Sequence, residues 1–168
     1  MKMSEYKEYT KLEIEKGITK ALVFLYKNDS VLLETKYNIN ERTVTHRLGM
    51  YLAEQFPEFD VDCEYNRMEK KDDLDKIINH ISKSLRNIKD YPESTLTNDT
   101  KAVTVYPDII VHKRKTDINL LVIEVKMGWK KDKAEFDRIK LEAYKEQLKY
   151  KFAVFLIIGE NNSEMEWF

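Results

Sequence analysis

The sequence predicts an α/β protein in which helices flank a mixed central sheet. Short apolar runs with strand character alternate with stretches whose apolar residues recur at helical spacing. A predicted helix separates the last two apolar strands, which is typical of a right-handed crossover between parallel strands. The chain has 168 residues, 42% of them hydrophobic, with four Gly and three Pro. We therefore expect a single domain over residues 1–168 with a full core.

The predicted helices follow from apolar spacing and from residues that begin or end a helix. An amphipathic helix is expected over Ser4–Tyr26, while residues 31–37 are ambiguous between helix and strand. Asn40 caps a second helix, which ends at about Phe56 before a proline. Two further helices are expected over Asp73–Ile88 and Asp132–Tyr150.

Four apolar, β-rich runs are predicted as strands. They are Phe59–Arg67, Val103–Lys113, Leu120–Met127 and Phe152–Gly159. A turn around Thr116 and Asp117 joins the second and third runs into a hairpin.

Composition limits the class of protein and its compartment. One cysteine, Cys63, excludes an internal disulfide and multi-cysteine metal sites. Lys and Arg total 29 against 30 Asp and Glu, so the net charge of −1 does not favour indiscriminate binding to nucleic acid. The sequence has no apolar run of transmembrane length. We expect a soluble, cytoplasmic protein that does not act at a membrane.

Charged residues inside two of the apolar runs mark the candidate site. Asp108 follows Pro107 in one strand, and Glu124-Val125-Lys126 lies within the next. Burying such groups costs several kcal/mol unless they are compensated, and a divalent metal with a phosphate would compensate all three. The pattern Glu-x-Lys occurs four times in the chain, but only this copy lies in a strand-like run.

Strand periodicity limits how these groups meet. The residues that share one face by alternation are Leu120, Val122, Glu124 and Lys126. A turn centred on Thr116 places Asp108 opposite Glu124, and a turn centred on Asp117 places it opposite Lys126. A centre between the two would put Asp108 on the other face. We expect a register in which the three groups converge.

These residue types suit metal-dependent hydrolysis. Asp108 and Glu124 would bind Mg²⁺ or Mn²⁺, with the Val125 carbonyl as a further ligand. Lys126 would orient or deprotonate the attacking water and offset charge on the phosphorane. The alternative is a salt bridge between Asp108 and Lys126 at the sheet edge, with Glu124 solvated.

Glu41 is the fourth candidate. It lies at the head of the core-facing stripe of the second helix, from which it could reach the same metal. A first-turn acid that interacts with the helix dipole is the other interpretation.

Six residues are expected to contact substrate, and several have an alternative role. They are Lys140 and Gln147 on the long helix, Arg47 on the second helix, and Trp129, Lys130 and Lys131 after the third strand. Lys140 could contact a site carboxylate instead of a phosphate. Trp129 could stack on a base or cover the helix start. Asp137 could pair with Lys140 or Arg138, and pairing on the helix surface is the simpler interpretation.

Glu41, Pro107-Asp108 and Glu124-Val125-Lys126, followed by a helix and an apolar strand, resemble the PD-(D/E)XK nuclease superfamily. The resemblance implies the restriction-endonuclease-like fold, a mixed four-stranded sheet flanked by helices, over a core of about residues 40–159. It implies that Asp108 and Glu124 bind magnesium and that Lys126 and Glu41 act in catalysis. The helical extension over residues 1–39 and the inserted helix depart from simpler members.

The leading hypothesis is a Mg²⁺-dependent nuclease that hydrolyses phosphodiester bonds of nucleic acid, with DNA as the favoured substrate. A catalytically silent module of the same fold, which binds nucleic acid or a protein partner, is the alternative. A third interpretation is an unrelated α/β protein with a salt bridge in its hairpin. The N-terminal helix and the inserted helix could shape substrate access or a homodimer. The C-terminal Trp167-Phe168 could form a docking or dimer contact, although packing on the chain's own sheet is the simpler explanation of these two residues.

Overall fold

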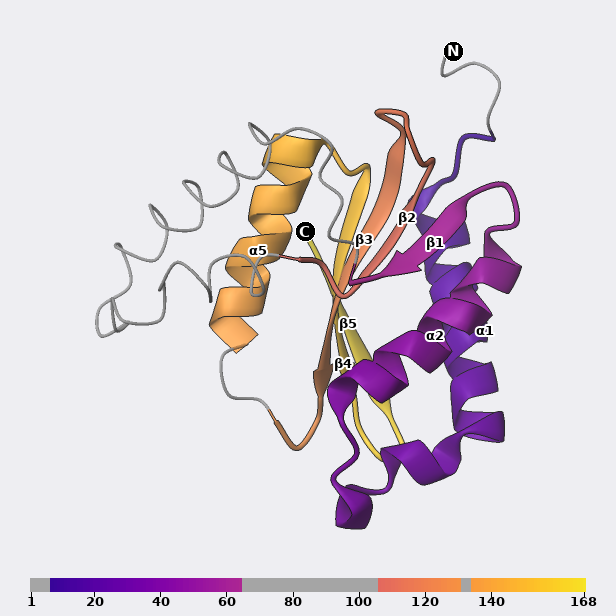
Figure 1. Ribbon diagram of the computed structural model, residues 1–168, viewed down its shortest axis with the longest axis vertical. Helices are drawn as coiled ribbons and strands as arrows, with labels where there is room; N and C mark the ends of the chain where they lie inside the picture. The colour runs from indigo at the N-terminus through magenta and orange to yellow at the C-terminus, as the bar shows by residue number, and fades with distance from the viewer. Residues whose placement is uncertain (1–6, 65–105, 131–133) are drawn as a thin grey trace.

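The computed structural model describes residues 7–64, 106–130 and 134–168, which form a five-stranded mixed sheet between helical layers (Figure 1). The strands in spatial order are β1 (Asp60–Cys63), β2 (Ile109–His112), β3 (Asn119–Met127), β4 (Phe152–Ile158) and β5 (Ser163–Trp167). Only β3 and β4 are parallel; the other neighbours are antiparallel. The prediction of an α/β protein with a mixed sheet is confirmed.

Three α-helices cover the sheet in the described part of the chain. They are α1 (Lys11–Asn28), α2 (Glu41–Gln55) and α5 (Ala134–Leu148). A capping box at Thr10 begins α1, and the Asn40 side chain accepts from the backbone N–H of Arg42 at the start of α2. The cap predicted at Asn40 is therefore confirmed. The ambiguous segment forms two short 3₁₀ turns, Ser30–Leu33 and Thr35–Tyr37.

Each face of the sheet buries its own apolar cluster. The cluster under α1 and α2 includes Ile123, Val125 and Leu156, whereas the cluster under α5 includes Val122 and Phe155. Figure 1 shows α5 on one side of the sheet, with α1 and α2 on the other. The chain passes from β3 through α5 to the parallel strand β4, as predicted for a crossover.

The predicted number of four strands is wrong because β5 forms a fifth. Its sequence alternates, with Met165 and Trp167 packed against the cluster under α1 and α2 while Glu164 and Glu166 are exposed. A strand at the sheet edge needs only this half-buried pattern. In a five-residue polar segment that pattern is too short to distinguish from a turn.

Some predicted elements lie partly or wholly outside the described residues. The inserted helix Asp73–Ile88 lies wholly outside them, as do residues 65–67 and 103–105 of two predicted strands. None of the helices in the three described ranges has the length and apolar character needed to span a bilayer.

Asp62 joins β1 to β2 through a partly buried polar network. Its carboxylate accepts from the Arg114 guanidinium, and its Oδ2 lies 2.8 Å from His112 Nε2. His112 is 5% exposed. The hydrogen bond from Arg114 and, to a lesser extent, the one from His112 hold the pKa of Asp62 below its usual value.

Asp62→Asn is expected to lower the free energy of unfolding at pH 7 by about 1.5–3 kcal/mol, because hydrogen bonds to a charged acceptor are lost. A lowered folded-state pKa stabilises the protein above the unfolded pKa of about 3.9, and this stabilisation is lost as the pH falls through the folded value. Urea unfolding at pH 7 and below pH 4 would show the difference between variant and wild type shrinking. A difference of equal size at both pH values, or a similar loss in the exposed-site control Asp117→Asn, would contradict this role.

Candidate active site

Beyond Ile123, strand β3 extends past the first residue of β2, and two carboxylates accept hydrogen bonds from its backbone there. The ladder between these strands ends with Ile109 opposite Ile123. Further along, the backbone N–H of Val125 donates to Asp108 Oδ2 at 2.7 Å, and the N–H of Met127 donates to Glu41 Oε2 at 3.0 Å. The residue that precedes β2 and a residue from the first turn of α2 are thereby anchored on the same edge of β3.

Asp108, Glu124 and Lys126 lie on the face of the sheet that α5 covers. Val122 and Ile110 pack in the cluster under α5, and alternation places Glu124 and Asp108 on the same side. One step beyond the pair Ile109–Ile123, Asp108 falls opposite Glu124, which is the register predicted for a turn centred on Thr116. The first of the two predicted registers is the one that forms.

Helix α5 adds two charged residues to this face. Lys140 Nζ lies 2.7 Å from Glu124 Oε2 and 3.4 Å from Asp137 Oδ1. Lys126 Nζ lies 2.8 Å from Asp137 Oδ2 and 3.6 Å from Glu41 Oε1. We call the six residues the charged cluster: Glu41, Asp108, Glu124, Lys126, Asp137 and Lys140.

The cluster is closely enclosed by protein. Glu124 is 1% exposed, and Asp137 and Lys140 are each 6% exposed. Asp108 keeps partial exposure as a residue, although protein surrounds most of its carboxyl group. If every group is charged, four carboxylates face two ammonium groups, so two negative charges remain uncompensated. One divalent cation would balance them.

Burial destabilises the ionised forms of the Glu124 and Asp108 carboxyl groups. Burial and the nearby Asp108 charge raise the pKa of Glu124 well above its usual value, although Lys140 opposes the shift. Burial also raises the pKa of Asp108, against the Lys140 charge and the hydrogen bond from Val125. Among the described residues, Glu124 Oε1 is one of three buried side-chain polar atoms without a hydrogen-bond partner; Asp137 Oδ2 is another, but the Lys126 ammonium lies 2.8 Å from it and compensates its charge. The Glu124 oxygen is suited to a cation.

Lys126 is held as an ammonium ion. Burial alone would lower its pKa, but the close contact with Asp137, with the charges of Asp137 and Glu41, outweighs burial and raises it. The predicted salt bridge to Asp108 is not how Lys126 is compensated, because its ion pairs are with Asp137 and Glu41. In this arrangement Lys126 can orient water and offset negative charge, whereas removing a proton from water would need a lower pKa.

The donors present fit a hard cation that retains water ligands. No three His, Cys, Asp or Glu side chains within residues 7–64, 106–130 and 134–168 are grouped as a metal site. Mg²⁺ is commonly held by one or two carboxylates together with waters and substrate phosphates. Asp108 and the uncommitted oxygen of Glu124 match that requirement. The Val125 carbonyl lies on the same strand edge as its N–H, and therefore on the side of Asp108.

Besides Trp129, three of the residues predicted to contact substrate lie outside the cluster. Arg47 Nε is 3.0 Å from Asp29 Oδ2, so its guanidinium joins α2 to the end of α1. Gln147 lies seven residues past Lys140 on the same side of α5, further along the helix. Lys130 forms a turn with Met127 directly after β3. Lys131 is not among the described residues.

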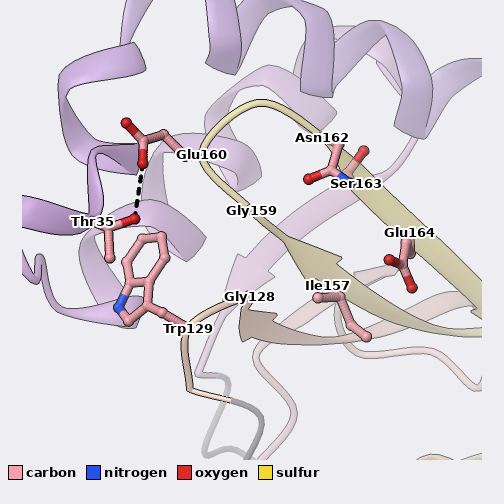
Figure 2. Close-up of a pocket in the computed structure, with 9 residues that line it drawn as sticks. All are labelled: Thr35, Gly128, Trp129, Ile157, Gly159, Glu160, Asn162, Ser163 and Glu164. Atoms are coloured by element: carbon pink, nitrogen blue, oxygen red, sulfur yellow. Dashed lines mark hydrogen bonds between the residues drawn. The ribbon is translucent and has the colours of Figure 1, made fainter.

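Trp129 packs against the apolar cluster under α1 and α2, whereas the predicted lid was over the start of α5, which packs on the other face of the sheet. It also lines a pocket of about 310 Å³ beside the β4–β5 turn, where the Thr35 hydroxyl donates to Glu160 at 2.9 Å (Figure 2). The pocket's charged side chains, Glu160 and Glu164, are acidic. This position favours the packing interpretation of Trp129 over stacking on a base.

Two buried residues of α5, Asp137 and Tyr144, lie near the site without having been predicted to belong to it. Asp137 is buried and bridges two lysines, in contrast to the helix-surface role considered simpler. Tyr144 is fully buried, and the charges of Glu124 and Asp108 add to burial in raising its pKa. The spacing of Asp137, Lys140 and Tyr144 places all three on one side of α5. This shared face is the feature of the sequence that could have identified Asp137 and Tyr144 as neighbours of the site.

No protein-family model, curated protein or solved structure matches this chain. The functional proposal therefore depends on the geometry of the charged cluster.

Proposed function

We propose that this protein is a metal-dependent nuclease that hydrolyses phosphodiester bonds of nucleic acid, with DNA as the favoured substrate and Mg²⁺ or Mn²⁺ as cofactor. The observation that carries the proposal is the convergence of Asp108, Glu124 and Lys126 on one face, with Glu124 Oε1 uncommitted. The resemblance of these motifs to PD-(D/E)XK nucleases supports nucleic acid as substrate. We also propose that the sheet is a restriction-endonuclease-like core extended by β5 and α1.

The acidic residues supply the cation site in this proposal. Asp108 and Glu124 would hold the ion, with the Val125 carbonyl beside them, and Glu41 would support the same edge of β3 from α2. When bound, the ion supplies positive charge that polarises a phosphoryl oxygen. Asp108 keeps its place through the Val125 N–H, so its carboxylate is oriented before the ion arrives.

Lys126 supplies the cationic group at the reaction centre. Its ammonium donates hydrogen bonds and can orient the attacking water towards phosphorus. It also offsets negative charge that develops on the phosphoryl oxygens in the transition state. Because Asp137 and Glu41 already restrain this ammonium, little reorganisation is needed when substrate binds.

Digestion of plasmid, linear duplex and single-stranded DNA, and of RNA, tests the proposal. Each substrate is incubated with Mg²⁺, Mn²⁺ or EDTA, and products are resolved on gels. Cleavage that requires the metal is expected. Persistent absence of cleavage with both metals would overturn the proposal. Salt-dependent binding without cleavage would then identify the silent binding module.

Asp108→Asn separates metal binding from folding. The amide oxygen can still accept from Val125 N–H, while the buried charge disappears, so metal-free stability should be unchanged or higher. Mg²⁺ at roughly 100 times its Kd would stabilise the wild type by about 2.7 kcal/mol, and the variant should lose this gain together with cleavage. Thermal unfolding with and without Mg²⁺ measures both effects. A marked loss of metal-free stability, or a Mg²⁺ response equal to that of the control Asp117→Asn, would indicate that Asp108 is structural.

A further inference from the structure

We propose that Asp137 is a positioning residue that fixes the ammonium groups of both Lys126 and Lys140 at the reaction centre. The inference rests on the proposed hydrolytic function and assigns Asp137 a role that its sequence context did not indicate. Asp137 is not a catalytic residue in this proposal, because it acts through the two lysines and not on the substrate.

Asp137 contacts each lysine with a different oxygen. Oδ2 lies 2.8 Å from Lys126 Nζ, and Oδ1 lies 3.4 Å from Lys140 Nζ. The two lysines come from different elements, β3 and α5, so one carboxylate joins the strand that carries the site to the helix that covers it. With an exposure of 6%, Asp137 makes these contacts away from bulk water, where ion pairs are weakly screened.

The two lysines depend on Asp137 to different extents. Lys140 has Glu124 as a closer partner, at 2.7 Å. The other carboxylate near Lys126 is Glu41, whose Oε1 is 3.6 Å away and whose Oε2 already accepts from the Met127 N–H. Loss of the Asp137 charge should therefore displace Lys126 more than Lys140. A misplacement of about 1 Å at a reacting group can lower the rate about 10²-fold.

Helix α5 contains a matched control. Glu135 is another acid in the first turn of α5, so it interacts with the helix dipole as Asp137 does. Its side chain is 62% exposed, and within the described residues its ion-pair partner is Arg138, at 4.0 Å. Glu135→Gln thus removes the same charge from the same turn without touching the cluster.

Steady-state cleavage kinetics and lysine-selective ¹⁵N NMR test the proposal together. For Asp137→Asn we expect kcat to fall about 10- to 100-fold with KM within about twofold, while Glu135→Gln stays within threefold of wild type. Asp137→Glu should recover part of the lost rate because it restores the charge. In metal-free protein, the Lys126 ammonium signal should be protected from exchange in the wild type and in Glu135→Gln, and lost or shifted in Asp137→Asn.

The outcomes separate this inference from the proposed function. A wild type that cleaves while Asp137→Asn keeps full kcat overturns the positioning role and leaves the nuclease intact. A wild type that never cleaves overturns the nuclease, and the NMR result alone then decides whether Asp137 holds Lys126.

If Asp137→Asn does not fold, the wild type still provides a test. A coupling across the hydrogen bond from Lys126 Nζ to the Asp137 carboxyl carbon supports the proposal, and its absence overturns it.

Discussion

Replacement of Lys140 by Met is expected to lower the free energy of unfolding by about 3–5 kcal/mol at pH 7, because it leaves a buried carboxylate without its cation. Glu124 is 1% exposed, and its nearest ammonium is that of Lys140. Chemical unfolding at pH 7 measures the loss. Lys20→Met, at an exposed position in α1, is the control and should change stability by at most about 0.5 kcal/mol.

The pH dependence of the Lys140→Met variant follows from Glu124. Its pKa is already raised in the wild type and rises further without Lys140. A carboxyl group whose folded pKa is raised destabilises the protein increasingly as the pH rises above the unfolded value of about 4.3. The deficit should therefore be smaller near pH 4 than at pH 7. Adding Glu124→Gln should restore at least half of the lost stability, since no buried charge is then left unpaired.

A single variant that unfolds at the same denaturant concentration as the wild type would show that the ion pair adds nothing. A double variant no more stable than Lys140→Met would mean that Lys140 stabilises the fold through packing of its chain, and not through Glu124.

Lys126→Met is expected to lower the cleavage rate by about 10²–10⁴-fold, which is the usual contribution of a positioned proton-transfer or charge-stabilising group. Lys126 is not among the proposed metal ligands, so stabilisation by Mg²⁺ should persist. This separates the variant from Asp108→Asn, which should lose both properties. Single-turnover cleavage and thermal unfolding with Mg²⁺ make the comparison.

Lys20→Met serves again as control, because it removes one lysine charge from an exposed position in α1, on the face of the sheet opposite α5. Cleavage by Lys126→Met within threefold of this control would remove Lys126 from the mechanism. Loss of the Mg²⁺ response as well would instead indicate that the site had collapsed.

Local features of the sequence were enough to predict most elements and the part of the site that lies on β3. The Asn40 cap, the proline after α2 and the apolar runs locate α2, β3 and β4 to within one or two residues. Alternation places Glu124 and Lys126 on one face because successive side chains of any strand point to opposite sides. These features depend only on neighbouring residues.

The sequence limited the hairpin register to two possibilities but did not choose between them. Two turn centres were acceptable, and the structure adopts the one in which Asp108 faces Glu124. Alternation also predicted Leu120 on the face of Glu124, but a register shift between Val111 and His112 places it in the cluster under α1 and α2. A bulge reverses the alternation beyond it. The apolar pattern of a single strand does not predict where a bulge will form.

The sequence by itself determined the main helices and strands and the common face of Glu124 and Lys126, since both follow from spacing along the backbone. Only the tertiary structure decided that Asp137 and Lys140 would be buried over Glu124 and Lys126. Charged residues on a helix are ordinarily expected in solvent. They can be buried here because α5 packs where each finds an opposite charge on β3, and that match depends on the relative placement of two elements.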